Sequence, residues 1–554
     1  MIYPALQKAN IAEWVKFSPE KIIVNGYESE FASKICEKNT EHNCKGGTLY
    51  IDAIKENSRH TEYIDETRKI TDEKYLIEVE KCPDGIRIVL TVSGKKSLFR
   101  AMNRVVQMNR QGEFFIGTAE DYPLFAERGY IEGFYGSPWS FDNRCKMLKL
   151  LSFHGMNTHY YAPKDDPYHR DKWDELYPEK ELSELSQLLE MCNENFVDFY
   201  FCIAPGLSMR YSSEADFAKL TCKAEQLYNI GVRNFGLLLD DIPDNLYFDE
   251  DKVAFDSEAV NAHIHISNKF YDYLKQLDHN CRLTVCPLQY HGNGDEYYIS
   301  KLGKGLDGAI KIFWTGHNIC SQEITVREAV IFENSTNRKP LYWDNYPVND
   351  AEMQNEMHMG YINGRDPDLY RYSEGIISNA MEYCLSSRVP LLTVADYLWN
   401  PVAYDGFSSW HKACEVVYGK DAETLMPFFD NLLISCLKVE NSPMMNIALN
   451  DAQQMYFGGD KEGARAVMAQ YLVKLAKCIV HIRESDDPVF KELAPWAEKQ
   501  HIAYVLLINA TGLLNDNSES GKNAVRKLIR DYLDHPKTLC DFSLQAFAER
   551  MLTL

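Results

Sequence analysis

The 554-residue sequence lacks the patterns that mark several large classes of protein. No stretch approaches the roughly 20 uninterrupted apolar residues that a membrane-spanning helix needs. The 15 cysteines are scattered, odd in number and never form a CxxC pair. We therefore expect buried thiols in a reducing compartment rather than a disulfide scaffold. The first residues show no basic region followed by an apolar stretch, so no signal peptide is predicted. The sequence thus favours a cytoplasmic protein. A secreted protein whose leader has been removed stays open as an alternative.

Positive charge is also scarce. Lys and Arg number 59 against 81 Asp and Glu, which gives a net charge of −22. Because nucleic acids and anionic membrane surfaces repel such a protein, we expect neither among its partners. Apolar residues make up 45% and aromatic residues 12% of the chain. This composition excludes a disordered protein and is sufficient for large hydrophobic cores.

Several catalytic signatures are missing as well. No strand-like segment is followed by the Gly-rich fingerprint of dinucleotide-binding folds. The 15 histidines show no HExxH spacing, and no GxSxG motif indicates a serine hydrolase. The sequence therefore predicts no cofactor and no bound metal.

Three patterns of apolar residues follow one another along the chain. Residues 1–122 alternate short β-branched runs with polar loops and include one helical stretch, which predicts a small α/β domain. Residues 123–405 alternate strands with amphipathic helices. Residues 406–554 lack strand signals and predict a C-terminal helical bundle, with long helices expected at 425–439, 464–482 and 496–514.

The middle segment contains eight candidate buried strands. They begin near Gly129, Asn157, Asp198, Asn234, Arg282, Ile310, Pro340 and Gly375. Eight strands that alternate with helices over roughly 275 residues are typical of a (β/α)₈ TIM barrel. The predicted fold class is therefore α/β, a TIM barrel between an N-terminal α/β domain and a C-terminal helical bundle. A doubly wound open sheet is the alternative.

Polar and aromatic side chains collect where the predicted strands end. In a barrel, the C-terminal strand ends form the face that holds the active site. These ends contain carboxylates, amides and aromatic rings, the groups that hold a sugar ring: Glu132, Gly133, Lys164, Asp165, Asp166, Asp240, Asp241, Tyr290, Thr315, Trp343, Asn345, Asp350 and Asn379.

Asp240 and Asp241 follow a continuous apolar run. Two adjacent carboxylates repel each other, which raises the pKa of one and supplies an acid beside an anion. The pair is explained equally well if one aspartate caps a helix and the other is solvated. Metal ligation is a third option, but no histidines at a suitable spacing accompany the two aspartates. Ordinary structural roles are also open for Lys164 (a surface ion pair), for Trp314 and Trp343 (core residues), and for Asn345 and Asn379 (loop caps).

Longer motifs then favour one family. The strings RGYIEGFYGSPWS from Arg128, NTHYYAPKDDPYHRDKW from Asn157 and GVRNFGLLLDDI from Gly231 closely resemble glycoside hydrolase family 84, the O-GlcNAcase-like β-N-acetylglucosaminidases. FWTG from Phe313, YWDNYPVND from Tyr342 and the segment around Asn379 agree in order and spacing. The resemblance is to a bacterial-type member and covers residues 1–405, and the helical tail more loosely.

The resemblance implies substrate-assisted catalysis, in which the substrate's 2-acetamido oxygen attacks the anomeric carbon and forms an oxazoline. It implies that Asp240 accepts the amide N–H and that Asp241 is the general acid and then the base. Tyr290 would hydrogen-bond the acetamido oxygen. The resemblance also implies three residues that contact the acetyl methyl: Cys286, Thr315 and Trp343. Five more would hold the sugar hydroxyls or orient the two aspartates: Gly133, Lys164, Asn345, Asp350 and Asn379. Among these, Asp350 would bind the 4- and 6-hydroxyls.

One position departs from the family. Members usually have Thr-Glu-Tyr where this chain has Leu288-Gln289-Tyr290. An apolar residue and a neutral amide thus replace a hydroxyl and a carboxylate. The replacement predicts a change in the orientation of Tyr290, in the pKa of the dyad or in substrate preference.

The sequence therefore favours a retaining exo-β-N-acetylglucosaminidase that acts on a GlcNAc-bearing glycan or glycoprotein. The alternatives are a non-catalytic glycan-binding protein with a retuned pocket, an N-acetylhexosaminidase of different sugar preference, and a metal-dependent barrel hydrolase. The natural aglycone, the choice between GlcNAc and GalNAc and the oligomeric state stay open, with a homodimer as one option.

Overall fold

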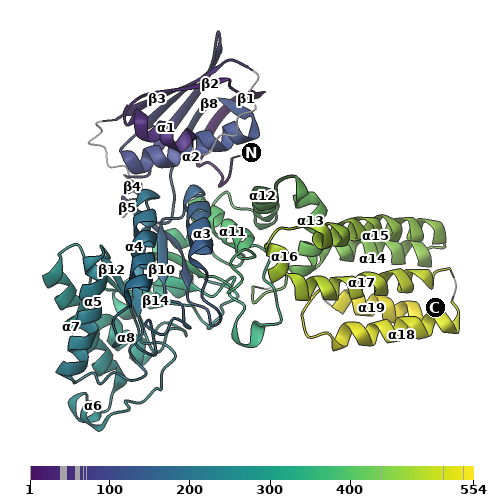
Figure 1. Cartoon of the computed structure of the whole chain (residues 1–554). Coiled ribbons are helices and arrows are strands. Elements are labelled where there is room, and N and C mark those ends of the chain that lie inside the picture. Colours follow the sequence, from purple (N-terminus) through teal and green to yellow (C-terminus); the bar gives the residue numbers. More distant parts are fainter. Residues whose placement is uncertain are drawn as a thin grey trace.

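A computed structural model describes residues 2–37, 46–56, 63–65, 68–69, 72–437, 440–515, 517–540 and 542–553. It has three parts that follow the chain order: a twisted sheet with helices, a closed barrel, and a set of long helices (Figure 1). The predicted fold class is confirmed. The residue boundaries given for the three domains stay a prediction.

The N-terminal part is a six-stranded mixed sheet with strand order β1-β8-β6-β7-β3-β2. Apolar residues alternate along its central strands, so one face is buried. The helices α1 (Ser29–Glu37) and α2 (Lys95–Gln111) lie together on that sheet (Figure 1). The strands are β1 (Lys8–Lys16), β2 (Lys21–Gly26), β3 (Thr48–Lys55), β6 (Tyr75–Cys82), β7 (Gly85–Val92) and β8 (Glu113–Asp121), with a separate pair β4 (Tyr63–Asp65) and β5 (Arg68–Lys69).

Buried polar contacts join this sheet to the barrel. The carboxylate of Glu73 accepts hydrogen bonds from Arg100 Nε of α2 at 2.8 Å and from Arg128 Nη2 of the barrel at 2.7 Å. Burial alone would raise the pKa of Glu73, but the positive charges of Arg128, Lys96 and Arg100 outweigh it and hold that pKa well below its usual range. Nearby, Trp399 Nε1 donates to Asp121 at 2.9 Å. The contact between the two parts is therefore ionic as well as apolar.

The middle part is an eight-stranded parallel barrel that closes between β16 and β9. All eight predicted strands are present: β9 (Glu127–Glu132), β10 (Thr158–Tyr161), β11 (Asp198–Ile203), β12 (Asn234–Leu238), β13 (Arg282–Cys286), β14 (Lys311–Trp314), β15 (Leu341–Asp344) and β16 (Gly375–Asn379). Nearly every strand residue is buried, because side chains on one face fill the barrel and those on the other pack under helices.

The outer helices follow the strands in turn. They are α3 (Phe141–Phe153), α4 (Glu179–Glu194), α5 (Glu214–Asn229), α6 (Asp249–Ala254), α7 (Ala259–Leu277), α8 (Tyr297–Gly305), α9 (Val326–Thr336), α10 (Leu369–Tyr372) and α11 (Arg388–Trp399), with a short 3₁₀ turn η1 (Ala351–Met353) after β15. Their starts follow from local chemistry: at α9, for example, Thr325 and Glu328 form a reciprocal capping box.

The C-terminal part consists of helices that pack side by side (Figure 1). They are α12 (Gly406–Tyr418), α13 (Ala422–Phe429), α14 (Pro443–Phe457), α15 (Lys461–Glu484), α16 (Val489–Glu492), α17 (Ala494–Gly512), α18 (Glu519–Asp534) and α19 (Phe542–Leu552), with 3₁₀ turns η2 (Gly419–Asp421) and η3 (Asp430–Leu432). Glu492 ties them to the barrel by accepting hydrogen bonds from the backbone N–H groups of Leu385 and Ser386. None of the described helices is long and apolar enough to cross a membrane.

Two of the three predicted C-terminal helices are confirmed as α15 and α17, but the one expected at 425–439 is wrong. The helix α13 ends at Phe429, and after η3 the described residues to 437 are not helical; residues 438–439 lie outside the described residues. The cause is Asp430, whose buried carboxylate accepts the backbone N–H of Met444 at the start of α14. Asn441 Oδ1 likewise accepts the N–H of Leu433. These side chains turn the chain back, which apolar periodicity does not reveal.

Replacing Glu73 by Ala should strongly destabilise the protein. The substitution leaves Arg100 and Arg128 buried without their carboxylate, and breaking a buried ion pair costs roughly 3–5 kcal/mol. Urea denaturation followed by tryptophan fluorescence measures the loss.

The matched control is Glu13→Ala, which removes an exposed ion pair with Lys81 in the same sheet. Exposed pairs contribute about 0.2–1 kcal/mol, so this variant should unfold almost like the parent. Equal losses for the two variants would contradict the assigned role of Glu73.

Candidate active site

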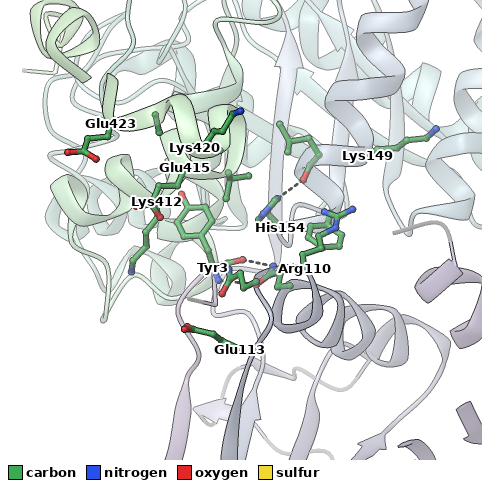
Figure 2. A pocket seen from close by; sticks show the side chains of 16 residues that line it. Tyr3, Arg110, Glu113, Lys149, His154, Lys412, Glu415, Lys420 and Glu423 are labelled. Atoms are coloured by element: carbon green, nitrogen blue, oxygen red, sulfur yellow. Dashed lines mark hydrogen bonds between the residues drawn. The ribbon is translucent and has the colours of Figure 1, made fainter. Parts of the chain in front are cut away.

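Several hollows lie in the described part of the chain, and we consider two of them as ligand sites. The larger, about 950 Å³, lies where α2, α3 and α12 meet, and Tyr3, Arg110, Lys149, His154 and Lys412 line it among others (Figure 2). It is remote from the strand ends where barrel proteins place their chemistry. The smaller, about 250 Å³, opens at those strand ends. Because ligand pockets for drug-sized molecules run from roughly 300 to 1,000 Å³, the smaller pocket suits a single small ring.

The smaller pocket contains all eleven residues that were predicted as catalytic or substrate-binding. They approach from the ends of seven of the eight strands: Gly133, Lys164, Asp240, Asp241, Cys286, Tyr290, Thr315, Trp343, Asn345, Asp350 and Asn379. Residues up to 246 positions apart are in direct contact here, as the hydrogen bond from Gly133 N to Asn379 Oδ1 shows. We refer to this site as the barrel pocket.

Other residues at the strand ends have structural roles instead. Glu132 is buried under α3 and accepts a hydrogen bond from Arg144 at 2.8 Å. Asp166 accepts the hydroxyls of Tyr161 and Tyr177, and Asp165 is exposed. Trp314 is a core residue that packs against α9, as its ordinary structural interpretation predicted.

Lys164 and Asp240 form a buried ion pair at the base of the barrel pocket. The Nζ atom of Lys164 lies 2.7 Å from Asp240 Oδ2, and the side chains are only 3% and 7% exposed. This excludes the structural alternative for Lys164, a surface ion pair, because the barrel wall encloses this strand end. The second oxygen of Asp240, Oδ1, is buried and accepts no hydrogen bond in the described part of the chain. Because Asp240 lines the barrel pocket, this oxygen is a buried acceptor without a donor in the pocket wall.

Asp241 faces the same pocket because its backbone breaks the strand geometry. Its φ angle of 53° is left-handed, a conformation that Asp tolerates better than most residues and that is common at functional sites. Side chains that alternate along a strand would otherwise point to opposite faces. Asp241 Oδ2 accepts the hydroxyl of Tyr135 at 2.8 Å, and Oδ1 accepts that of Tyr290 at 3.1 Å.

The electrostatics of the pair differ from the sequence prediction. Repulsion was expected to raise the pKa of one carboxyl. Burial does act in that direction on Asp241, but the charge of Lys164 and the two tyrosine hydrogen bonds outweigh it and lower the pKa of Asp241. For Asp241 the expected rise is therefore not found, because a buried cation, 3.7 Å from Asp241 Oδ2, offsets the repulsion.

The opposite wall is a hydrogen-bonded network around Asn345. Its Oδ1 accepts the indole N–H of Trp343 at 2.8 Å and the amide of Asn379 at 3.0 Å. Its Nδ2 donates to the carbonyl of Ile319 at 2.8 Å. Gly133 packs directly against this wall. A side chain at this position does not fit, because its Cβ would lie 2.4 Å from the Trp343 ring.

Asp350, in the segment after β15, also lines the barrel pocket. Its Oδ2 accepts the backbone N–H of Tyr135 at 2.8 Å. Burial raises the pKa of Asp350, in contrast to that of Asp241. The pocket thus holds carboxyl groups whose pKa values are pushed apart, which is typical of acid–base sites.

Sequence reasoning missed several pocket residues. The most important is Tyr135, which bridges Asp241 and Asp350 and whose hydroxyl accepts a hydrogen bond from Arg170 at 2.7 Å. Tyr135 lies three residues beyond β9, within a quoted family motif, so its position offered a signal. The others come from loops whose course the sequence does not reveal: Ile319, Cys320, Val348, Ala351 and Met353.

The residues that depart from the family, Leu288 and Gln289, lie outside the lining of the barrel pocket, and the predicted effect of the departure stays a prediction. Leu288 packs against the hydrophobic core, Gln289 is exposed, and neither lines the barrel pocket. Tyr290 still reaches Asp241. Within the described residues, no group of three or more His, Cys, Asp or Glu side chains is arranged to hold a metal ion.

Comparison with known proteins agrees with this geometry. A family described as beta-N-acetylglucosaminidase matches residues 128–431. Among curated relatives, the protein O-GlcNAcase of Rattus norvegicus is 33% identical over 291 residues, which are 51% of this chain and 30% of the rat protein. This chain therefore matches less than a third of that relative's length.

Solved structures extend the likeness beyond the barrel. A mutant of the O-GlcNAc hydrolase of Thermobaculum terrenum superposes with a TM-score of 0.73 at 30% identity, covering 77% of this chain and 95% of that one. The structure of CpGH84B superposes with a TM-score of 0.84 at 26% identity over 100% of both chains. From the match over residues 128–431 and these structures, the chain belongs to the beta-N-acetylglucosaminidase family, glycoside hydrolase family 84.

Proposed function

We propose that this protein is a retaining exo-β-N-acetylglucosaminidase that removes terminal GlcNAc with help from the substrate's own acetamido group. The observation that supports it most strongly is Asp240. One oxygen of this carboxylate is fixed by Lys164, and the other is a buried acceptor without a donor beside the pocket. Because an unpaired buried acceptor is costly, it favours a ligand that supplies an N–H, as an acetamido group does.

In the first step, the acetamido oxygen attacks the anomeric carbon from within the pocket. Asp240 accepts the amide N–H, holds the group in position and stabilises the positive charge that develops on it. Asp241 gives its proton to the leaving oxygen as the glycosidic bond breaks. The products of this step are an oxazoline and the released aglycone.

In the second step, Asp241 acts as a base. It removes a proton from water, which opens the oxazoline at the anomeric carbon and restores the acetamido group. Two inversions at one carbon give overall retention. Adjacent carboxylates can divide these tasks because their surroundings differ: Asp240 is buried against Lys164, whereas the Asp241 side chain is 31% exposed.

The first step requires a protonated Asp241, although the unliganded site favours its ionised form. A bound sugar resolves this difference. It covers the exposed part of Asp241 and removes water, and this desolvation raises the pKa of a carboxyl group. The proton is thus taken up as the substrate enters.

The other pocket residues suit the remaining parts of GlcNAc. In the proposed complex Tyr290 turns its hydroxyl from Asp241 to the acetamido oxygen, and the pocket residues Cys286, Thr315 and Trp343 contact the acetyl methyl. Asp350, Asn345 and Asn379 offer acceptors and donors to the ring hydroxyls, with Asp350 assigned to the 4- and 6-hydroxyls. A site built to hydrogen-bond a hydroxyl rejects analogues that lack or misplace it. We therefore propose GlcNAc rather than GalNAc as the sugar.

For the aglycone we propose Ser or Thr of a protein. The similar proteins are named protein O-GlcNAcase and O-GlcNAc hydrolase. The net charge of −22 makes long polyanionic glycans unfavourable partners.

Replacing Asp241 by Asn should separate substrates by their leaving groups. General acid catalysis contributes about 10²–10⁴-fold, so an alkyl β-GlcNAc glycoside should lose that much in kcat/KM. A 4-nitrophenyl β-GlcNAc, whose leaving group needs little protonation, should lose less at its cleavage step. Initial rates on the two substrates, with oxazoline formation measured by single turnover, check the difference.

The matched control is Asp165→Asn, which changes an exposed carboxyl one residue from Lys164 and outside the barrel pocket. It should hydrolyse both substrates at the parent's rate. An Asp241→Asn variant as active as the parent would contradict the assignment. A parent that binds an oxazoline analogue without turnover would instead establish a glycan-binding protein.

Replacing Tyr135 by Phe should move the alkaline limb of the rate–pH profile to higher pH. The Tyr135 hydroxyl donates a hydrogen bond to the Asp241 carboxylate and so favours its ionised form. Without that bond the pKa of Asp241 rises, and the acid stays protonated to higher pH. The pH dependence of kcat measures the shift.

Tyr297→Phe is the control, because Tyr297 also donates to a carboxylate, that of Glu258, but lies outside the barrel pocket. Its profile should match that of the parent. An alkaline limb that stays in place or moves to lower pH in Tyr135→Phe would show that Asp241 is not the group being titrated.

A further inference from the structure

Two cysteines from distant parts of the chain meet at the edge of the barrel pocket. Cys320 lies in the loop after β14, and Cys436 follows η3 in the C-terminal part. The two thiols lie close enough that each shifts the pKa of the other. Both are free thiols and partly exposed, whereas Cys202 and Cys286 inside the barrel are fully enclosed. Cys320 itself lines the barrel pocket, so small solutes that enter the pocket reach it.

The two cysteines also flank a pocket residue. Cys436 Sγ donates to the backbone carbonyl of Asn345 at 3.6 Å. The residue before Cys320, Ile319, accepts the Asn345 side chain through its carbonyl at 2.8 Å. Asn345 in turn accepts the hydrogen bonds of Trp343 and Asn379. A change in the bonding of the two cysteines therefore affects the pocket wall through Asn345.

The chemistry of the pair favours thiol–disulfide exchange. The neighbouring Cys436 thiol lowers the pKa of the Cys320 thiol, and this outweighs the opposing effect of burial. The pKa of the Cys436 thiol is raised. One thiol is thus the better thiolate and nucleophile, and the other is a resolving partner already in contact, an arrangement typical of redox-active pairs. Burial raises the pKa of Cys202 and of Cys286, which makes both poor nucleophiles.

We propose that Cys320 and Cys436 are a reversible oxidation site. A low-molecular-weight disulfide oxidises the two cysteines to a Cys320–Cys436 disulfide, which links the barrel loop to the C-terminal part and weakens sugar binding. The Cys320 thiolate attacks one sulfur of the small disulfide, forms a mixed disulfide and releases one small thiolate. Cys436 gives up its proton and attacks the sulfur of Cys320, which releases the second small thiol. The two cysteines lose two electrons and two protons in total, and the small disulfide is reduced to two thiols.

The bond changes the pocket wall in two ways. The Cys436 sulfur no longer donates to the Asn345 carbonyl, and the loop that holds Ile319 is tied to the C-terminal part. The effect on the sugar rests on the proposed function, whereas formation of the bond does not. A ligand in the barrel pocket covers Cys320 and should slow the exchange.

The test treats the full-length protein with oxidised glutathione and maps its peptides by mass spectrometry before and after dithiothreitol. We expect a peptide pair linked through Cys320 and Cys436 that is two hydrogen masses lighter and disappears on reduction. Oxidised protein should lose about tenfold in kcat/KM on 4-nitrophenyl β-GlcNAc, on the scale of one lost buried hydrogen bond, and recover with dithiothreitol.

Two variants sharpen the test. Cys436→Ser should form no link and should stop at the mixed disulfide of Cys320 with glutathione, which the same peptide map detects, whereas Cys222→Ser, which removes an exposed cysteine of α5, should respond like the parent. Absence of the linked peptides in the parent would overturn the proposal, and so would a link that leaves both kcat/KM and GlcNAc binding unchanged. If the parent hydrolyses no glycoside, the linked peptides and GlcNAc binding still decide the oxidation site, so the two proposals fail separately.

Discussion

The buried ion pair between Lys164 and Asp240 is the interaction around which the barrel pocket is arranged. Two charges enclosed by a barrel wall are costly unless each satisfies the other, so their positions fix the ends of β10 and β12 relative to one another. The same lysine offsets the repulsion between Asp240 and Asp241, which lets two adjacent carboxylates face one small cavity. Without that cation, the left-handed turn at Asp241 would bring like charges together with mainly the hydroxyls of Tyr135 and Tyr290 to offset their repulsion.

From this constraint the rest of the site follows outward. Tyr135 and Tyr290 donate hydrogen bonds to Asp241, and Asn345 accepts the indole N–H of Trp343 in the pocket wall. Asp350 accepts the backbone N–H of Tyr135. The C-terminal part contacts this wall through Cys436, so the helices beyond residue 406 are adjacent to the site rather than separate from it. A pocket with so many fixed dipoles is suited to stabilise charge that develops during a reaction.

Much of this could be predicted from the sequence. The eight buried strands followed from apolar runs at regular spacing, and closure of the barrel placed their polar ends together without further information. Contacts made by single side chains could not be predicted. Repulsion within the dyad was predictable, but not that Lys164 would be enclosed beside it. The turn enforced by Asp430 was equally hidden, because a buried carboxylate that caps a later helix leaves no periodic signal. Tyr135, Cys320 and Cys436 depend on loop paths that only the folded chain defines.

The central claim is that Asp240 orients a nucleophile that belongs to the substrate. The most direct measurement compares 4-nitrophenyl β-glycosides whose 2-acetamido methyl bears no, one, two or three fluorines. Fluorine withdraws electrons from the amide oxygen and makes it a weaker nucleophile. The account predicts that kcat/KM falls steeply with each fluorine added. A rate that does not depend on the number of fluorines would contradict it and point to a carboxylate of the protein as the nucleophile.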